Sequence, residues 1–343
     1  MERDGLAILV NSEDPFNAKT AVGVLRYGRD RIVGLVDPER AGQTAGDVYN
    51  VRPDVPIVAG VSELPDSTGR LLVGIASRGG VMPPEMKGEI LAAIERGMDI
   101  YNGLHHFLDE DPDFVTAAKR KNVKLIDLRR VPEDLPVGQA LPHRAGSHVV
   151  LTVGSDCNVG KMSTALELDL LARQRGLKSM FLATGQTGIM IAHNGIAIDR
   201  VIADFTNGAM EQLVIEASNA NDWVFVEGQG SLVHPGYSGV TMGLLHGTAP
   251  DLMILCHQPT REHIRRLTFP IPPLAKVRAL YEDAASWIAP SKVAGIALNT
   301  YDLDEQAARD VIKRIEDEHG LPTTDVIRFG PEKLLDALLA CVR

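Results

Sequence analysis

The sequence predicts an α/β protein of two domains, each built around a parallel sheet. Three observations lead to this class. Short apolar runs alternate with helical stretches along the whole chain. A proline-containing segment without periodicity interrupts the alternation near the middle. The 343 residues are enough for two domains that each bury a core of their own.

The first half contains the elements of a Rossmann-like domain. Its apolar runs are short and its helical stretches carry apolar residues at helical spacing. Strands are predicted over 6–10, 31–36, 56–58, 71–75, 99–101 and 124–127, and helices over 18–27, 85–96 and 115–121. Because strands that alternate with helices pair in parallel, the ligand crevice should lie beyond their carboxyl ends.

The second half restarts the same alternation after the aperiodic segment. We therefore expect a first domain over 1–135, a linker over 136–147 and a second domain over 148–343. In the second domain, strands are predicted over 149–153, 178–183, 223–226, 252–256 and 293–298, and helices over 161–175, 208–220, 305–318 and 332–339.

Composition limits the possible partners. The net charge of −10 argues against nucleic acid and anionic membrane surfaces as partners. Three cysteines without CxxC spacing indicate a reducing compartment and no disulfide framework. No apolar run reaches the length of a membrane span or a signal peptide. The expectation is a cytoplasmic protein that acts on small molecules and forms a homo-oligomer, as enzymes of this size often do.

The strongest motif is the stretch HVVLTVGSDCNVGKMSTAL, over 148–166. A strand, a glycine turn and a helix in this order direct backbone N–H groups and one lysine at a single point, which is how proteins hold phosphate. It departs from a Walker A loop, because Ser155 replaces the first glycine and Met162 replaces the Mg²⁺-binding Ser or Thr. The predicted cofactor-binding residues are Asp156, Cys157, Asn158, Val159, Gly160, Lys161, Met162, Ser163 and Thr164.

A second motif is VFVEGQGSLVHPGYSG, over 224–239, where a strand delivers Glu227 into a glycine-rich loop that also carries His234. Glu227 occupies the position of a Walker B carboxylate; the alternative is a strand-end residue without a function. Further polar residues follow predicted strands, so they are candidates for the same crevice. The candidate bases are Glu227, Asp204 and His234; the candidate substrate-binding residues are Lys19, Arg78, Gln186 and Thr187; no metal ligands are predicted.

Two resemblances follow from these motifs. The residues 154–161 and 227–228 resemble the P-loop and the VEG element of dethiobiotin synthetase and related ATP-dependent enzymes. Over nearly the whole chain, the order NSEDPFNAKT, IASRGGVMPP, GSDCNVGKMSTALEL, TGQTGIMI and VEGQGSLVHP resembles the D-glutamate N-acetyltransferases. That resemblance implies acetyl-CoA as the acetyl donor and an amino acid, D-glutamate, as the acceptor.

The departure at Met162 is compatible with this reading, because backbone N–H groups and a lysine can hold the phosphates of CoA without Mg²⁺. Splitting a β–γ phosphate bond usually needs a well-placed metal ion. Two alternatives stay open: a ligase that uses ATP and Mg²⁺, and a nucleotide-sensing regulator that binds without turnover. Ser163 or Thr164 could replace the missing metal ligand in either of them.

Overall fold

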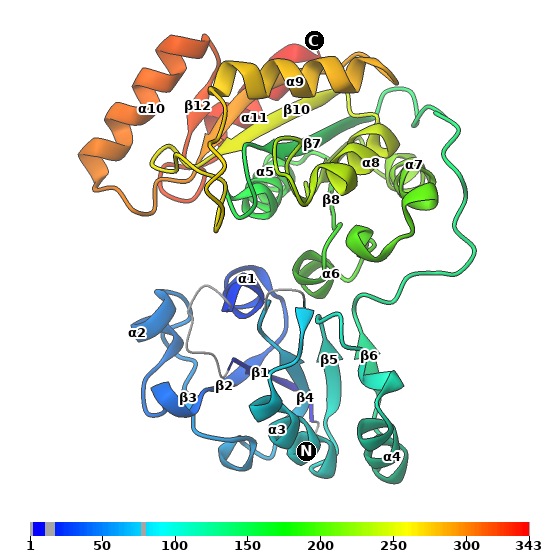
Figure 1. Ribbon diagram of the computed structural model, residues 1–343. Coiled ribbons are helices and arrows are strands. Elements are labelled where there is room, and N and C mark those ends of the chain that lie inside the picture. Colours follow the sequence, from blue (N-terminus) through cyan, green and yellow to red (C-terminus); the bar gives the residue numbers. More distant parts are fainter. Residues whose placement is uncertain (1–2, 11–17, 77–79, 343) are drawn as a thin grey trace. The chain divides into compact units, whose positions relative to one another are not determined.

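The computed structural model describes residues 3–10, 18–76 and 80–342, which form two compact units (Figure 1). The first unit comprises Met1–Arg130 and Gln186–Ala197, and the second comprises Val131–Gly185 and Ile198–Arg343. None of the helices in the described ranges combines the length and the apolar character that crossing a bilayer requires.

The first unit has a six-stranded sheet in the order β3-β2-β1-β4-β5-β6, and every pair is parallel. This is the strand order of a Rossmann fold. The strands are β1 (Gly5–Leu9), β2 (Ile32–Val36), β3 (Ile57–Val58), β4 (Thr68–Val73), β5 (Asp99–Asn102) and β6 (Leu125–Asp127). The helices from this part of the chain are α1 (Lys19–Tyr27), α2 (Ala45–Tyr49), α3 (Pro84–Glu95) and α4 (Pro112–Lys121).

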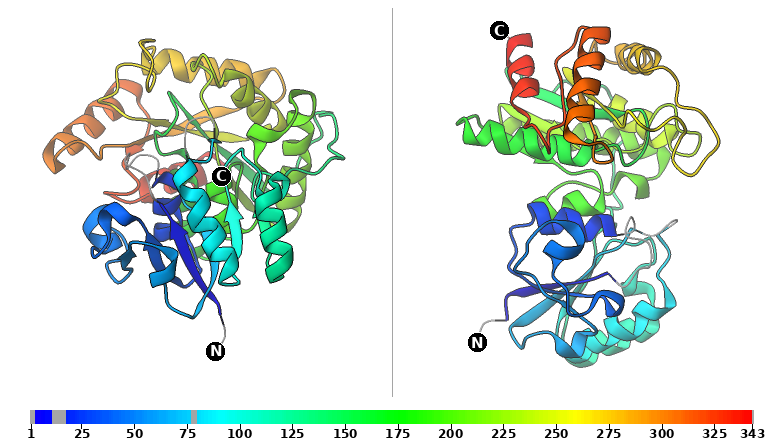
Figure 2. Two further views of the ribbon diagram at one scale, coloured as in Figure 1. Left: turned by 60° about the horizontal axis from the view of Figure 1, so that its bottom comes forward. Right: turned by 90° about the vertical axis from the view of Figure 1, so that its left-hand side faces the viewer.

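One helix of the first unit comes from much later in the chain. Helix α6 (Gln186–Ala192) packs on α1, and Figures 1 and 2 both show the two helices side by side. A hydrogen bond of 2.9 Å joins the Thr20 and Thr187 hydroxyls inside this contact. The chain therefore passes between the units three times, at 130/131, 185/186 and 197/198. The predicted boundaries, which place 148–343 in one domain, do not include these crossings.

The second unit also has a six-stranded parallel sheet, in the order β12-β11-β10-β7-β9-β8. Its strands are β7 (His148–Gly154), β8 (Ser179–Leu182), β9 (Trp223–Val226), β10 (Leu252–His257), β11 (Lys292–Leu298) and β12 (Thr323–Thr324). Its helices are α5 (Lys161–Gln174), α7 (Ala203–Ala220), α8 (Ser238–Thr248), α9 (Leu274–Ser286), α10 (Glu305–His319) and α11 (Glu332–Cys341). Strand β7 is buried from its second residue onward, as expected for a central parallel strand.

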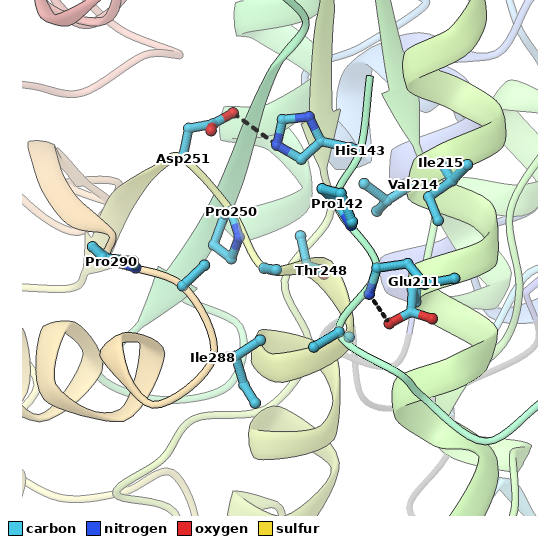
Figure 3. A pocket seen from close by; sticks show the side chains of 15 residues that line it. Pro142, His143, Glu211, Val214, Ile215, Thr248, Pro250, Asp251, Ile288 and Pro290 are labelled. Atoms are coloured by element: carbon cyan, nitrogen blue, oxygen red, sulfur yellow. Dashed lines mark hydrogen bonds and ion pairs between the residues drawn. The ribbon is translucent and has the colours of Figure 1, made fainter. Parts of the chain in front are cut away.

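The aperiodic segment has a defined path over α7 in the second unit. The N–H groups of Gln139 and Leu141 donate to the Glu211 carboxylate at 3.1 and 2.9 Å. His143 forms an ion pair of 3.2 Å with Asp251, which raises the pKa of the histidine. Together with the ends of α8 and α9, the segment lines a small pocket (Figure 3). The sequence pattern did not predict helices α2, α6, α8 and α9 or strand β12.

Candidate functional site: a phosphate-binding loop

The loop between β7 and α5 has the backbone of an anion site. Asn158 and Gly160 have positive φ angles of 54° and 102°, and α5 begins directly afterwards at Lys161. Left-handed residues next to the start of a helix turn successive N–H groups inward, where the helix dipole adds positive potential. The Lys161 side chain is 7% exposed, and its Nζ donates to the Asp156 carbonyl oxygen at 2.8 Å. The loop therefore holds its own cation within reach of a bound anion.

A buried tyrosine fixes the entrance to this loop. The Tyr281 hydroxyl on α9 donates to the Gly154 carbonyl oxygen at 2.9 Å and accepts from the Leu232 N–H at 3.1 Å. Burial raises the pKa of Tyr281 to about 12, so the hydroxyl keeps its proton at neutral pH. One side chain thus joins the phosphate-binding loop to the glycine-rich loop after β9.

The Asp156 side chain makes its contacts within the protein and anchors the loop. Its fully buried carboxylate pairs with Arg261 at 2.8 Å and accepts the Arg265 N–H at 2.7 Å and the Cys157 N–H at 2.6 Å. The neighbouring Ser155 hydroxyl lies 2.8 Å from Nδ1 of His257, whose pKa is lowered to about 4 by burial and by Arg261. The pairing with Arg261 neutralises the charge of the Asp156 carboxylate, which would otherwise repel phosphate.

The two hydroxyls considered as replacements for a metal ligand differ in placement. Thr164 is 2% exposed, and its hydroxyl accepts from the Cys256 thiol at 3.6 Å. Burial raises the pKa of that thiol to about 11, so it remains a donor. Because Met162 is also buried, Ser163 is the partly exposed hydroxyl of the first helical turn.

Glu227 follows β9, the strand next to β7, and its carboxylate faces the end of β8. It accepts the Thr184 N–H at 3.1 Å and the Gln229 side-chain amide at 3.2 Å, and it is 2% exposed. A Cβ at Gly228 would lie 1.7 Å from the Thr152 carbonyl oxygen and 2.9 Å from Lys161 Cδ. Only glycine allows this approach, which packs the lysine stem against the strand end that carries Glu227.

His234 is oriented as a hydrogen-bond donor. Its Nδ1 accepts the Gly236 N–H at 3.0 Å, so a neutral ring carries its proton on Nε2. Burial lowers the pKa of His234, and Lys161 lowers it further while Asp156 raises it. The ring is therefore neutral, and the lone pair that a general base needs is already in use. This geometry suits binding of an anion better than the base role expected from the sequence.

Within the described part of the chain, Asp156, Cys157 and His234 have side-chain ligand atoms within 4.8 Å of one another. Their chemistry does not fit a cation. The aspartate is paired with Arg261, and the histidine presents an N–H in place of a lone pair.

The other predicted residues belong to helices α1, α6 and α7 or lie outside the described residues. Gln186 and Thr187 are buried in α6 of the first unit, where Arg129 donates to the Gln186 side chain at 2.8 Å. Asp204 is exposed in the first turn of α7. Lys19 is exposed at the start of α1, and Arg78 lies outside the described residues.

Sequence reasoning missed three residues that shape the site. Tyr281 and Arg261 act on the loop from more than 100 positions away, and Thr184 meets Glu227 across neighbouring strands. The sequence could have predicted a buried Tyr281, because this residue lies at helical spacing among the apolar residues of 274–285. The arginine carried none beyond its charge.

Comparison with known proteins agrees with this architecture. A P-loop domain of unknown function (DUF1611_C) matches residues 136–335, and a Rossmann-like domain of unknown function (DUF1611_N) matches residues 38–131. A crystal structure of a DUF1611 family protein from Anabaena variabilis superposes with a TM-score of 0.92 at 40% identity, covering 98% of this chain and 99% of that chain.

Two curated relatives have names that state an activity. The D-glutamate N-acetyltransferase of Tritonibacter scottomollicae is 38% identical over 99% of both chains. The D-glutamate N-acetyltransferase of a Pseudoalteromonas species is 37% identical over 77% of this chain and 79% of its own length. With family matches over 136–335 and 38–131, the chain belongs to the DUF1611 family.

Proposed function

We propose that this protein transfers the acetyl group of acetyl-CoA to the amine of D-glutamate. The observation that carries the proposal is a phosphate-binding loop with Lys161 and inward-turned N–H groups but with Met162 in place of the metal-binding hydroxyl. It is supported by the identity to proteins named D-glutamate N-acetyltransferase along nearly the full chain.

The CoA pyrophosphate would lie on residues 158–164, at the start of α5. Charge-assisted hydrogen bonds from Lys161 and hydrogen bonds from N–H groups at the start of the helix suit it, since the first turn of a helix can direct its N–H groups at an anion. His234 would add its Nε2–H to the same anion. These contacts need no metal ion.

The thioester must lie away from the phosphates, because the long pantetheine arm separates them. We infer that the arm follows the carboxyl edge of the sheet from β7 past β9 toward β8, where the Glu227 carboxylate lies. Glu227 would accept a proton from the substrate ammonium. The free amine then attacks the thioester carbonyl, the C–S bond breaks, and the CoA thiolate leaves and takes up a proton.

Substitution of Glu227 tests this assignment. Glu227→Gln should lower kcat about 100-fold or more and leave the KM for acetyl-CoA nearly unchanged, because a lost base typically costs 10²–10⁴ in rate. The exposed Glu216 on α7 provides the matched control, Glu216→Gln, which should behave like the wild type. An equal loss of acetyl-CoA affinity would instead assign Glu227 to holding the loop.

D-Glutamate also needs cations for its carboxylates. We propose Lys19, which is exposed at the start of α1, for this role. Lys19→Gln should raise the KM for D-glutamate and leave the KM for acetyl-CoA unchanged. A change in both KM values would contradict a role of Lys19 in binding D-glutamate. Parallel assays with L-glutamate show which enantiomer of glutamate the enzyme prefers as acceptor.

Calorimetric titration separates this function from a nucleotide-dependent one. Acetyl-CoA should bind in the presence of EDTA, and Lys161→Ala should weaken that binding. Binding of ATP only with Mg²⁺, and no binding of acetyl-CoA, would favour the ligase. We also propose that the protein forms a homo-oligomer, whose mass light scattering would measure. A cytoplasmic location is proposed because three free cysteines are consistent with a reducing compartment.

A further inference from the structure

The connection between β10 and α9 forms a short arm beside the phosphate-binding loop. We call residues 260–270 the arginine arm. A bridge pairs His263 with Pro270, and the Ile264 N–H donates to the Phe269 carbonyl oxygen at 2.8 Å. The Ile264 side chain is fully buried and holds the arm against the second unit.

Two contacts with Asp156 attach the arm to the phosphate-binding loop. The Arg261 guanidinium donates to the Asp156 carboxylate at 2.8 Å and to the Cys157 carbonyl oxygen at 2.7 Å. The backbone N–H of Arg265 donates to the same carboxylate at 2.7 Å. The position of the arm is therefore fixed with respect to any phosphate held by the loop.

The chemistry of the arm suits an anionic aromatic ligand. It carries three arginines and one glutamate within 261–266, and Arg261 is paired with Asp156. Phe269 in the arm is 50% exposed, and Tyr301 in the loop after β11 is 61% exposed. Asp302, next to this tyrosine, accepts a hydrogen bond from the Thr260 hydroxyl at the base of the arm. An exposed aromatic ring and an arginine in the same loop can supply a stacking face and a phosphate contact.

The backbone at Arg266 supports a role for its side chain. Arg266 is exposed and has a φ of +64°, in a turn closed by the Leu267 N–H and the Ile264 carbonyl oxygen at 2.9 Å. Glycine or asparagine usually occupies such a position, because a Cβ is strained there. An arginine at a position that favours glycine points to a function for the guanidinium.

The strand order fixes the direction in which a ligand would extend. The loop after β7 holds the pyrophosphate, the arm follows β10, and Tyr301 follows β11, in the sheet order β11-β10-β7. We propose that the arginine arm binds the 3′-phosphoadenosine end of CoA, with Arg266 on the 3′-phosphate and Phe269 on the adenine face. This inference rests on the proposed function, and it explains how the protein would distinguish CoA from nucleotides without a 3′-phosphate.

The test compares acetyl-CoA with 3′-dephospho-acetyl-CoA as acetyl donors to D-glutamate. Arg266→Gly is the sharpest variant, because glycine accepts the local backbone and the fold is retained. It should raise the KM for acetyl-CoA roughly 10- to 100-fold, the loss expected for a charged hydrogen bond, and leave the KM for the dephospho donor unchanged. Arg266→Lys should retain part of the discrimination. Arg120→Ala, which removes an exposed arginine from α4 of the first unit, is the charge-matched control.

The possible outcomes are separable. If Arg266→Gly weakens both donors equally, or if the wild type does not distinguish them, the assignment of the 3′-phosphate is overturned and the acetyltransferase function stands. If the wild type transfers acetyl from neither donor to D-glutamate, the proposed function itself fails. Phe269→Ala should raise the KM for both donors alike, and an unchanged KM would contradict the stacking role.

Discussion

Tyr281→Phe removes one oxygen atom and leaves the volume of the buried side chain almost unchanged. The hydroxyl joins the Gly154 carbonyl oxygen to the Leu232 N–H, and no cavity is created when it is lost. Each polar group left without its partner costs about 1–3 kcal/mol, so the loss of both contacts should lower the unfolding free energy of the second unit by about 2–6 kcal/mol. Because the link that Tyr281 makes between the loops after β7 and β9 is then lost, the KM for acetyl-CoA should also rise.

Urea denaturation followed by tryptophan fluorescence measures this loss in the second unit alone. Both tryptophans of the chain lie there, and Trp223 is 4% exposed, so its emission changes on unfolding. Tyr237→Phe in the same glycine-rich loop is the matched control, because Tyr237 is 51% exposed; its effect should stay within about 0.5 kcal/mol. A Tyr281→Phe protein as stable as this control would refute the role of the hydroxyl as a structural joint.

Three further predictions concern the same unit. The pKa of His257 is about 4 in the folded protein and near 6.5 in the unfolded chain. Because the unfolded chain then binds a proton more readily, lowering the pH from 6.5 to 4 should reduce the unfolding free energy by about 3 kcal/mol. Denaturation measured across this pH range should show a smaller decrease for His257→Gln. Gly228→Ala places a Cβ 1.7 Å from a backbone oxygen and should abolish acetyl-CoA binding in calorimetry, whereas Gly239→Ala meets nothing within 4 Å and should be neutral. Cys256 is buried with a pKa of about 11 and should react with a thiol reagent only after the protein unfolds. Cys157 should react in the native protein, and acetyl-CoA should slow this reaction. A rate of Cys157 modification that acetyl-CoA does not change would contradict the place of this residue in the binding loop.

The local part of the site could be predicted from the sequence. The strand 149–153, the glycine turn and Lys161 are consecutive, so their pattern indicates the structure without any distant contact. Glu227 was likewise identifiable as the end of a buried strand followed by a glycine loop. The family resemblance, carried by five short motifs in order, is confirmed by identity along the chain.

The remainder depends on contacts that no local pattern encodes. Arg261 and Asp156 are 105 positions apart, and their pairing follows only from β7 and β10 being neighbours in the sheet. Helix α8 carries three glycines within SGVTMGLLHGT, and its packing on α7 compensates for a weak helix propensity. The orientation of His234 depends on one backbone N–H two residues away, which the residue type alone does not reveal.

The placement of α6 has a consequence for how the protein is made. All strands of the first unit are synthesised by residue 127, but the helix that packs on α1 follows only after β7 and β8 of the second unit. During synthesis on the ribosome, the face of α1 that contacts α6 therefore stays uncovered until β7 and β8 of the second unit have been made. A single cut in the aperiodic segment would not yield two complete bodies. An exchange of either half between related genes would have to move two separate stretches of coding sequence together.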